Sequence, residues 1–176
     1  MRPWELLDRA NTPTEGGELC LYRRGSEYSI RVDGNELMNS RMHHSEEMMA
    51  ERVSDGLVNR ETPRILVGGL GMGFTLAASI RSLPSTAIIE VSELSRAVIA
   101  WNRGVLGALA GHPLENPRVT INEGDICALI TAASVRYDAI LLDVDNGPDG
   151  LTLTSNQWLY SHDGIRKIAA ALKPEG

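Results

Sequence analysis

The sequence is poor in cysteine and in aromatic side chains. It contains two cysteines, and Phe, Trp and Tyr together make up 5% of the residues, with a single Phe. Cys20 and Cys127 are far apart and match no metal-binding or redox spacing. This excludes a fold held together by several disulfides, and it indicates reduced thiols in a cytoplasmic protein.

Long hydrophobic runs are absent as well. No stretch approaches the roughly 18 apolar residues of a membrane-spanning helix, and the N-terminus lacks the apolar core of a signal peptide. We therefore expect a cytoplasmic protein with no membrane partner.

Positive charge is in the minority. The chain has 17 Lys and Arg against 23 Asp and Glu, which gives a net charge of −6 and a pI of about 5.2. A chain of this charge is a poor ligand for the phosphate backbone, so we expect no nucleic-acid partner. The hydrophobic content of 43% over 176 residues is ordinary for a globular protein with one main core.

The pattern changes near residue 44. Residues 1–15 show no periodicity and are predicted to be loosely ordered, whereas residues 18–23 and 28–32 alternate apolar and polar side chains around a turn. We predict a β-hairpin cap over residues 1–44. Residues 45–176 alternate short apolar strands with amphipathic helices, which predicts a Rossmann-like, doubly wound, mostly parallel α/β sheet.

The predicted sheet is incomplete at its C-terminal end. A complete sheet of this kind would continue with another strand directly after Gly176. Without it the strand predicted at residues 137–142 is an open edge, and open edges pair with other chains. We therefore infer either a truncated product or a partner chain that covers this edge. The expectation is poor solubility or a homodimer that buries the edge or pairs the caps.

Residues 64–73 carry the most specific pattern in the chain. A strand at 64–68 leads into glycines at positions 69, 71 and 73, and a helix is predicted from Phe74. Gly69, Gly71 and Gly73 lack a Cβ atom, so the backbone can approach a ligand at the N-terminus of the helix. The third glycine comes one residue earlier than in the G-x-G-x-x-G dinucleotide fingerprint. This spacing is typical of an S-adenosylmethionine-type binding loop.

Two acids follow at the expected ends of later strands. Glu90 is placed near the end of the strand at residues 86–91, where a carboxylate can accept hydrogen bonds from both hydroxyls of a ribose. Asp125 follows the third strand and can accept a bond from an adenine amino group, or it can be the N-cap of the next helix. Alternatively, Glu90 is a solvated loop acid; the two roles of Asp125 can coexist.

The fourth strand also ends in acids. Asp143 is the candidate general base, because the apolar residues around it would desolvate its carboxyl and raise its pKa. Asp145 is a candidate for holding a cationic amine, although residues 145–150 are also typical of a turn. Ligands of open α/β sheets bind beyond the carboxyl ends of the strands, so these acids and the glycine loop should meet in one crevice.

With these residues in view, the chain resembles the polyamine aminopropyltransferase (spermidine synthase) family, within the class I S-adenosylmethionine-dependent methyltransferase superfamily. The resemblance covers about residues 17–176. It rests on the β-rich cap, the glycine loop, Glu90 in place of the family's ribose acid, Gly124-Asp125, Asp143 followed by Gly147-Pro148, and the closing residues 172–176. Gly71 stands where the family has an aspartate.

The resemblance implies transfer of an aminopropyl group from decarboxylated S-adenosylmethionine, or of an alkyl group from S-adenosylmethionine itself, to a small-molecule amine. Two alternatives remain open: a class I methyltransferase of a small molecule, and a nucleoside-binding module without catalysis. No metal is expected, because the adjacent His43 and His44 point in different directions and have no further donor at helical spacing. Glu46 and Glu47 either add negative charge to the entrance of the predicted crevice or are simply acids in the first turn of a helix.

Overall fold

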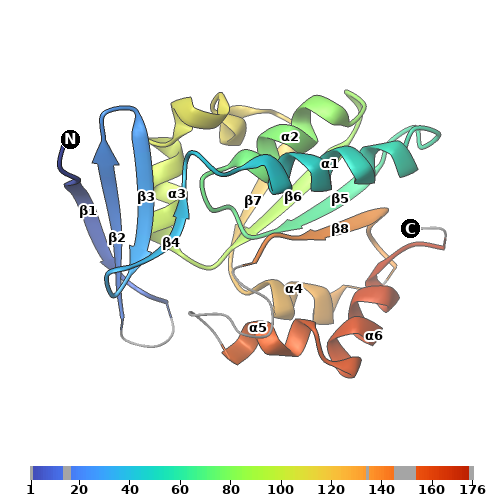
Figure 1. Cartoon of the computed structure of the whole chain (residues 1–176). Helices are drawn as coiled ribbons and strands as arrows, with labels where there is room; N and C mark the ends of the chain where they lie inside the picture. The colour runs from blue at the N-terminus through green and yellow to red at the C-terminus, as the bar shows by residue number, and fades with distance from the viewer. Residues whose placement is uncertain (1, 14–16, 134, 145–153, 175–176) are drawn as a thin grey trace.

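Two four-stranded sheets lie side by side in the computed structural model (Figure 1), which describes residues 2–13, 17–133, 135–144 and 154–174. The first, which we call the cap sheet, is antiparallel with the order β1-β2-β3-β4. Its strands are β1 (Glu5–Asn11), β2 (Glu18–Arg24), β3 (Glu27–Val32) and β4 (Asn35–Asn39).

The strand β1 corrects the prediction that residues 1–15 are loosely ordered. It pairs with β2 along its length, at the edge of the cap sheet, and most of its side chains are exposed. A register shift between Leu6 and Asp8 interrupts the pairing, turns Leu7 toward the main core, and aims Asp8 at the indole of Trp101, whose Nε1 donates to it at 2.7 Å. An exposed edge strand with a bulge has no regular apolar alternation, so the sequence pattern did not show it.

The second sheet is parallel, with the order β7-β6-β5-β8, and confirms the predicted α/β class. Its strands are β5 (Arg64–Gly68), β6 (Ile88–Glu93), β7 (Val119–Glu123) and β8 (Ala139–Leu142). The strand β5 has the predicted bounds, but β6 begins and ends two residues later than the predicted strand at residues 86–91.

Helices cover both faces of this parallel sheet (Figure 1). One face carries α1 (His44–Gly56), α2 (Phe74–Ser82) and α3 (Arg96–Arg103). The other carries α4 (Ile126–Ala132), α5 (Thr154–Leu159) and α6 (His162–Ala171), and the short 3₁₀ helices η1 (Gly107–Ala110) and η2 (Pro113–Glu115) follow α3. Alternate residues of β5 enter the two cores: Ile65 and Val67 pack under α2, and Leu66 packs on the side of α4.

Within the described ranges, no helix is both long enough and apolar enough to cross a bilayer.

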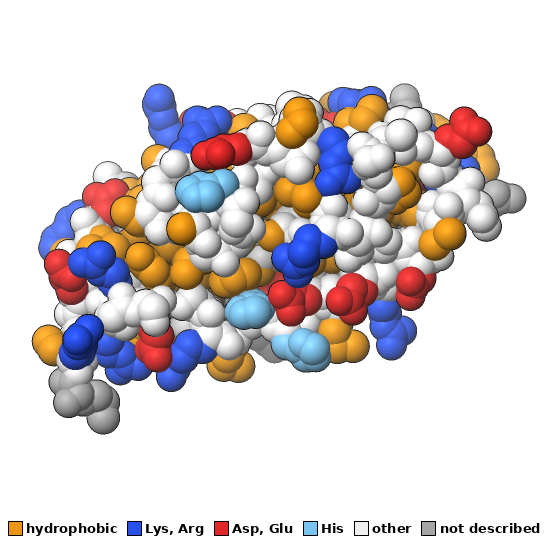
Figure 2. Space-filling model, turned by 90° about the horizontal axis from the view of Figure 1, so that it is seen from above, with side chains coloured by type: hydrophobic (Ala, Val, Ile, Leu, Met, Phe, Trp, Pro, Cys, Tyr) orange, Lys and Arg blue, Asp and Glu red, His pale blue; other side chains and the backbone are white. Residues whose placement is uncertain are grey.

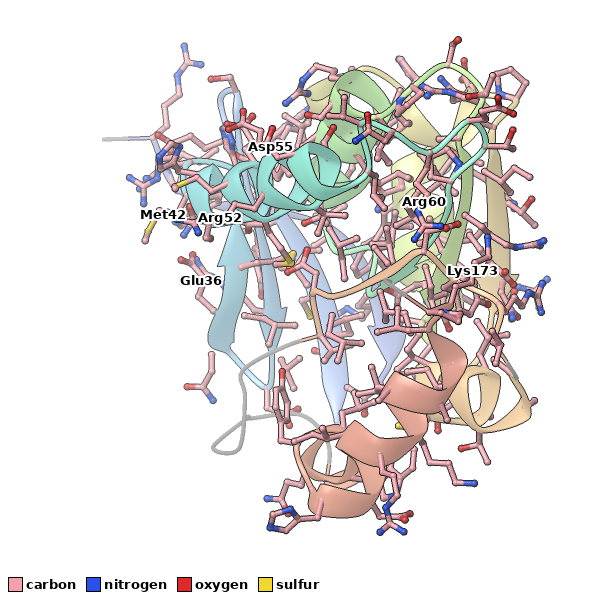
Figure 3. The ribbon with its side chains drawn as sticks, turned by 90° about the vertical axis from the view of Figure 1, so that its right-hand side faces the viewer. Glu36, Met42, Arg52, Asp55, Arg60 and Lys173 are labelled. Carbon is pink, nitrogen blue, oxygen red and sulfur yellow. The ribbon has the colours of Figure 1, made fainter. Side chains whose placement is uncertain are left out.

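An ion-pair cluster closes the end of the parallel sheet that is opposite the carboxyl ends of its strands. Asp138 is buried, and it accepts hydrogen bonds from the backbone N–H of Arg64 and from Nζ of Lys173, both at 2.7 Å. Arg60 Nε lies 3.8 Å from the other oxygen. Figure 3 shows Arg60 and Lys173 at the same end of the molecule, above α6. Burial acts to raise the pKa of Asp138, but Lys173 and the Arg64 N–H outweigh it and hold that pKa below its usual value.

We predict that Asp138→Asn lowers the free energy of unfolding by about 1–3 kcal/mol near neutral pH, since a charged hydrogen bond is lost. The folded-state pKa is lowered, so this contribution is present above the unfolded pKa of about 3.9 and is lost as the pH falls through the folded value. Urea unfolding should therefore show the gap between parent and variant closing in acid. Glu5→Gln, which removes an exposed pair with Arg23, should change stability by less than about 1 kcal/mol. Equal losses for the two variants would contradict this role of Asp138.

Candidate functional site

The glycine loop, residues 69–73, joins β5 to α2 with three glycines in the left-handed region. The φ angles are 89° at Gly69, 51° at Gly71 and 84° at Gly73. A Cβ atom on Gly69 would overlap the backbone carbonyl of Asp143, where the chain leaves β8. The absence of a side chain at position 69 thus lets the two strand ends approach each other.

The carboxylate of Glu93 braces this loop from the end of β6. One oxygen accepts the N–H of Leu70 at 2.9 Å, and the other accepts the N–H of Ser95 at 2.7 Å. Gly69 donates to the Ser92 carbonyl at 2.8 Å, so the loop and the end of β6 are joined by backbone as well. Burial raises the pKa of Glu93, against the lowering effect of the Ser95 and Leu70 N–H groups.

A cavity of about 130 Å³ lies between this loop and the cap sheet. The carboxyl ends of the parallel strands form one wall, and apolar side chains of β2, β3 and β4 form the other. The described residues that line it are Thr12, Pro13, Leu19, Ile30, Val32, Leu37, Met38, Gly69, Gly71, Ser92, Glu93, Leu94, Ser95, Val98, Gly124, Asp125, Ile126, Asp143 and Val144. Every charged side chain in this set is an acid.

The placement of Glu90 at the strand end, and so at the crevice, is wrong. Because β6 runs on to Glu93, Glu90 lies in mid-strand, and alternation points it to the α4 side of the sheet. There its carboxylate accepts from the hydroxyl of Tyr137 at 3.0 Å and lies 3.1 Å from Arg136. Glu93 is the acid that reaches the cavity. The signal that identifies it is register: positions 89, 91 and 93 share one face, and only the last is polar.

Asp125 lines the cavity and is also the N-cap of α4. Its side chain accepts the N–H of Cys127 at 2.8 Å. The N-cap role is confirmed, and the contact with an adenine amino group stays a prediction. The glycine that precedes it, Gly124, receives a hydrogen bond on its carbonyl from the Ser92 hydroxyl.

Asp143 lies where the cavity meets the glycine loop. Its carboxylate accepts a hydrogen bond of 2.5 Å from the hydroxyl of Thr75, in the first turn of α2. Burial raises the pKa of Asp143; the Thr75 hydroxyl lowers it, and the charge of Glu46 raises it further. The predicted direction is confirmed. Thr75 was not predicted, because a buried threonine in a helix gives no sequence signal. Asp145 lies outside the described residues.

A small crevice of about 10 Å³ adjoins the cavity on the side of α1. It is lined by Met38, Asn39, Glu46, Leu70, Met72, Phe74 and Asp143, so Met38 and Asp143 border both spaces. Glu46 and Asp143 thus contribute two carboxylates to a space whose other lining residues are Asn39 and residues with thioether, aliphatic or aromatic side chains.

A separate, open groove runs over the outer side of α2. Its lining includes His43, His112 and the apolar residues Phe74, Leu109 and Pro113. Figure 2 looks onto this side of the molecule, where hydrophobic side chains gather near histidines. His43 stacks on Phe74 with ring centroids 4.3 Å apart. Among the described residues, no three His, Cys, Asp or Glu side chains are grouped as a metal site.

The parallel order β7-β6-β5-β8, the glycine loop and the acid at the end of β6 define the class I methyltransferase-like α/β fold. Solved structures agree. The spermidine synthase of Thermotoga maritima superposes with a TM-score of 0.74 at 15% identity, covering 96% of this chain and 54% of that one. A spermidine synthase in complex with the transition-state analogue AdoDATO gives 0.76 at 15% identity, covering 96% and 55%.

Sequence comparison finds similar proteins as well. Putrescine N-methyltransferase 2 of Nicotiana attenuata is 33% identical over 114 residues, which are 64% of this chain and 29% of that protein. The polyamine aminopropyltransferase of Nitrosomonas europaea is 27% identical, covering 100% of this chain and 52% of that protein. No model of a protein family matches the chain. The chain thus spans about half the length of that aminopropyltransferase and less of the methyltransferase. These comparisons confirm the predicted resemblance: the chain is similar in sequence to a polyamine aminopropyltransferase and to putrescine N-methyltransferases, and similar in fold to spermidine synthases.

We predict that Gly69→Ala destabilises the fold far more than Gly34→Ala. Both glycines have a positive φ, 89° and 84°, but only at position 69 would the new Cβ meet backbone; nothing lies within 4 Å of it at position 34. Gly34→Ala should cost about 1–2 kcal/mol, the strain of a left-handed alanine. Gly69→Ala carries that strain and must also open the contact with Asp143. Thermal and urea unfolding of both variants measure the difference, and equal losses would show that the close approach is unimportant.

Proposed function

We propose that this chain contributes the donor-binding and proton-accepting half of a transferase that moves an alkyl group, preferably aminopropyl, from an S-adenosylmethionine-type sulfonium to a small amine. The observation that carries the proposal is the cavity between the glycine loop and the cap sheet, whose described charged side chains are Glu93, Asp125 and Asp143. The sequence similarity to a polyamine aminopropyltransferase and to a putrescine N-methyltransferase supports it.

The adenosine part of the donor fits the end of the cavity beside β6 and α4. Glu93 would accept from the ribose hydroxyls in addition to the N–H groups of Leu70 and Ser95. Asp125, which also lines the cavity, would accept from the adenine amino group. The apolar residues Leu94 and Ile126, also in the lining, supply surfaces for a flat ring.

The charge of the lining favours a donor without a carboxylate. No Lys, Arg or His is among the described lining residues, whereas three carboxylates are. The carboxylate of S-adenosylmethionine would lack a counter-ion there and would be repelled, while an aminopropyl ammonium would be attracted. We therefore favour decarboxylated S-adenosylmethionine as the co-substrate, bound without a metal.

The chemical step needs a neutral amine in line with the carbon–sulfur bond. The amine nitrogen attacks the carbon bonded to sulfur, the N–C bond forms, and the C–S electrons leave with the thioether product. The new ammonium then loses one proton. Asp143 borders both the cavity and the crevice, and its raised pKa suits it to take this proton. Glu46 attracts the cationic remainder of the substrate, and Asp145 stays a prediction for the same task.

Methyl transfer to an amine is the second candidate, favoured by the similarity to putrescine N-methyltransferases over 114 residues. It would use the same base and a donor that keeps its carboxylate. A nucleoside-binding module without catalysis would bind adenosine compounds and release no product. We also keep as predictions a cytoplasmic homodimer with no nucleic-acid or membrane partner; sedimentation tests the homodimer.

The deciding assay offers each donor, decarboxylated or carboxylated, with putrescine or spermidine. Methylthioadenosine release from the decarboxylated donor supports aminopropyl transfer, and S-adenosylhomocysteine release from the other supports methyl transfer. If the protein binds methylthioadenosine but releases neither product, the catalytic proposal is wrong.

The pH profile tests Asp143 as the base. Asp143→Asn should lower turnover about 10²–10⁴-fold while methylthioadenosine still binds. In the parent the rate should rise with pH through a pKa above the usual 3.9 or so of Asp. Thr75→Val removes a group that lowers this pKa, so the rise should move to higher pH. Glu46→Gln removes a charge that raises it, so the rise should move to lower pH. Shifts of the same sign in both variants would rule out this assignment.

Binding tests which acid holds the ribose. Glu93→Gln should weaken methylthioadenosine binding by about 10- to 100-fold, as expected for loss of charged hydrogen bonds. Glu90→Gln is the matched control: it should leave that affinity unchanged and lower the free energy of unfolding, because its carboxylate bonds Tyr137 and Arg136. Calorimetric titration distinguishes the two, and the opposite pattern would return the ribose role to Glu90.

A further inference from the structure

The buried side chain of Asn102, in the last turn of α3, contacts the glycine loop from behind. It is 1% exposed and is absent from the described lining of the cavity. Its Nδ2 donates to the carbonyl of Gly71 at 2.8 Å and to the carbonyl of Val98 at 3.0 Å. The first bond joins α3 to the loop, and the second is internal to the helix.

The other end of the same amide faces the start of α2. Asn102 Oδ1 is buried without a hydrogen-bond partner, and a Cβ atom built on Gly73 would lie 2.9 Å from it. An unpartnered buried oxygen is costly, and an apolar side chain at position 102 would avoid that cost. What asparagine supplies at this position is therefore the pair of hydrogen bonds from Nδ2 and not apolar packing.

The two carbonyl partners fix the orientation of the amide, since only its nitrogen can donate to them. Asn102 thus holds the Gly71 carbonyl, while Glu93 holds the N–H of the neighbouring Leu70. These two hydrogen bonds fix the orientation of the peptide groups of the loop, whose residues Gly69 and Gly71 line the cavity.

We propose that Asn102 is a positioning residue for the glycine loop, which it holds in its ligand-binding shape without touching the ligand. The consequence for donor binding rests on the proposed function, but the consequence for the loop does not.

The discriminating variant is Asn102→Ser. A serine hydroxyl in a helix can still bond the carbonyl four residues earlier, here Val98, but it is too short to reach Gly71 as well. In the protein without ligand, amide exchange at residues 69–73 should speed up about tenfold, as expected for one lost hydrogen bond, with β5 unchanged. Methylthioadenosine should bind about tenfold more weakly, and the KM for the donor should rise with little change in kcat or in the KM for the amine.

Ser79→Ala is the matched control. Ser79 is also a helical side chain with 1% exposure, and it donates to one backbone carbonyl, that of Thr75, at 2.8 Å. It should lower stability slightly and leave exchange in the loop unchanged.

A measurement on the parent covers the case in which Asn102→Ser fails to fold: the side-chain amide protons of Asn102 should exchange slowly.

Parent-like exchange at residues 69–73 in Asn102→Ser, or fast exchange of the Asn102 side-chain amide in the parent, would overturn the proposal. If exchange in the loop rises but methylthioadenosine binds neither protein, Asn102 still positions the loop, and it is the proposed donor site that is wrong.

Discussion

The close approach of the glycine loop to the end of β8 is the constraint on which the site depends. The backbone of Gly69 packs against that of Asp143 so closely that no side chain could be accommodated at position 69. This contact brings Asp143 beside the loop and within 2.5 Å of Thr75 on the following helix. It also sets the ends of β5, β6 and β8 side by side, so that acids from separate strands share one cavity.

The acids at this cavity are tolerable because each has backbone or hydroxyl donors. Glu93 accepts two N–H groups, Asp125 accepts one, and Asp143 accepts the Thr75 hydroxyl. Burial still raises the pKa of Glu93 and of Asp143, so the donors only partly offset the loss of water. A cationic ligand would supply the missing charge, which is a reason for a sulfonium or an ammonium to enter.

The sequence was enough to predict the α/β class, the bounds of β5, the first residue of α2, and the convergence of Asp125 and Asp143 on the cavity beside the loop. Those elements are strongly patterned: a continuous apolar run, regular glycines and a capping acid. The end of β6 was harder to predict, because Ile88–Glu93 contains two acids on opposite faces of the sheet. Moving the end of the strand by two residues decides which of these acids lies at the carboxyl edge. Neighbours that come from distant parts of the chain, such as Thr75 beside Asp143 or Asp8 beside Trp101, have no local signal at all.

Both sheets line the cavity. One wall belongs to the parallel sheet and the other to the cap sheet, which supplies Leu19, Ile30 and Leu37. A molecule that fills this space therefore contacts both sheets at once and links two layers that share no strand pairing. Ligand binding and the packing of the two sheets against each other are therefore coupled, because a ligand that binds only the packed state stabilises that state by mass action. The cap is then as much a part of the binding event as the loop that faces it.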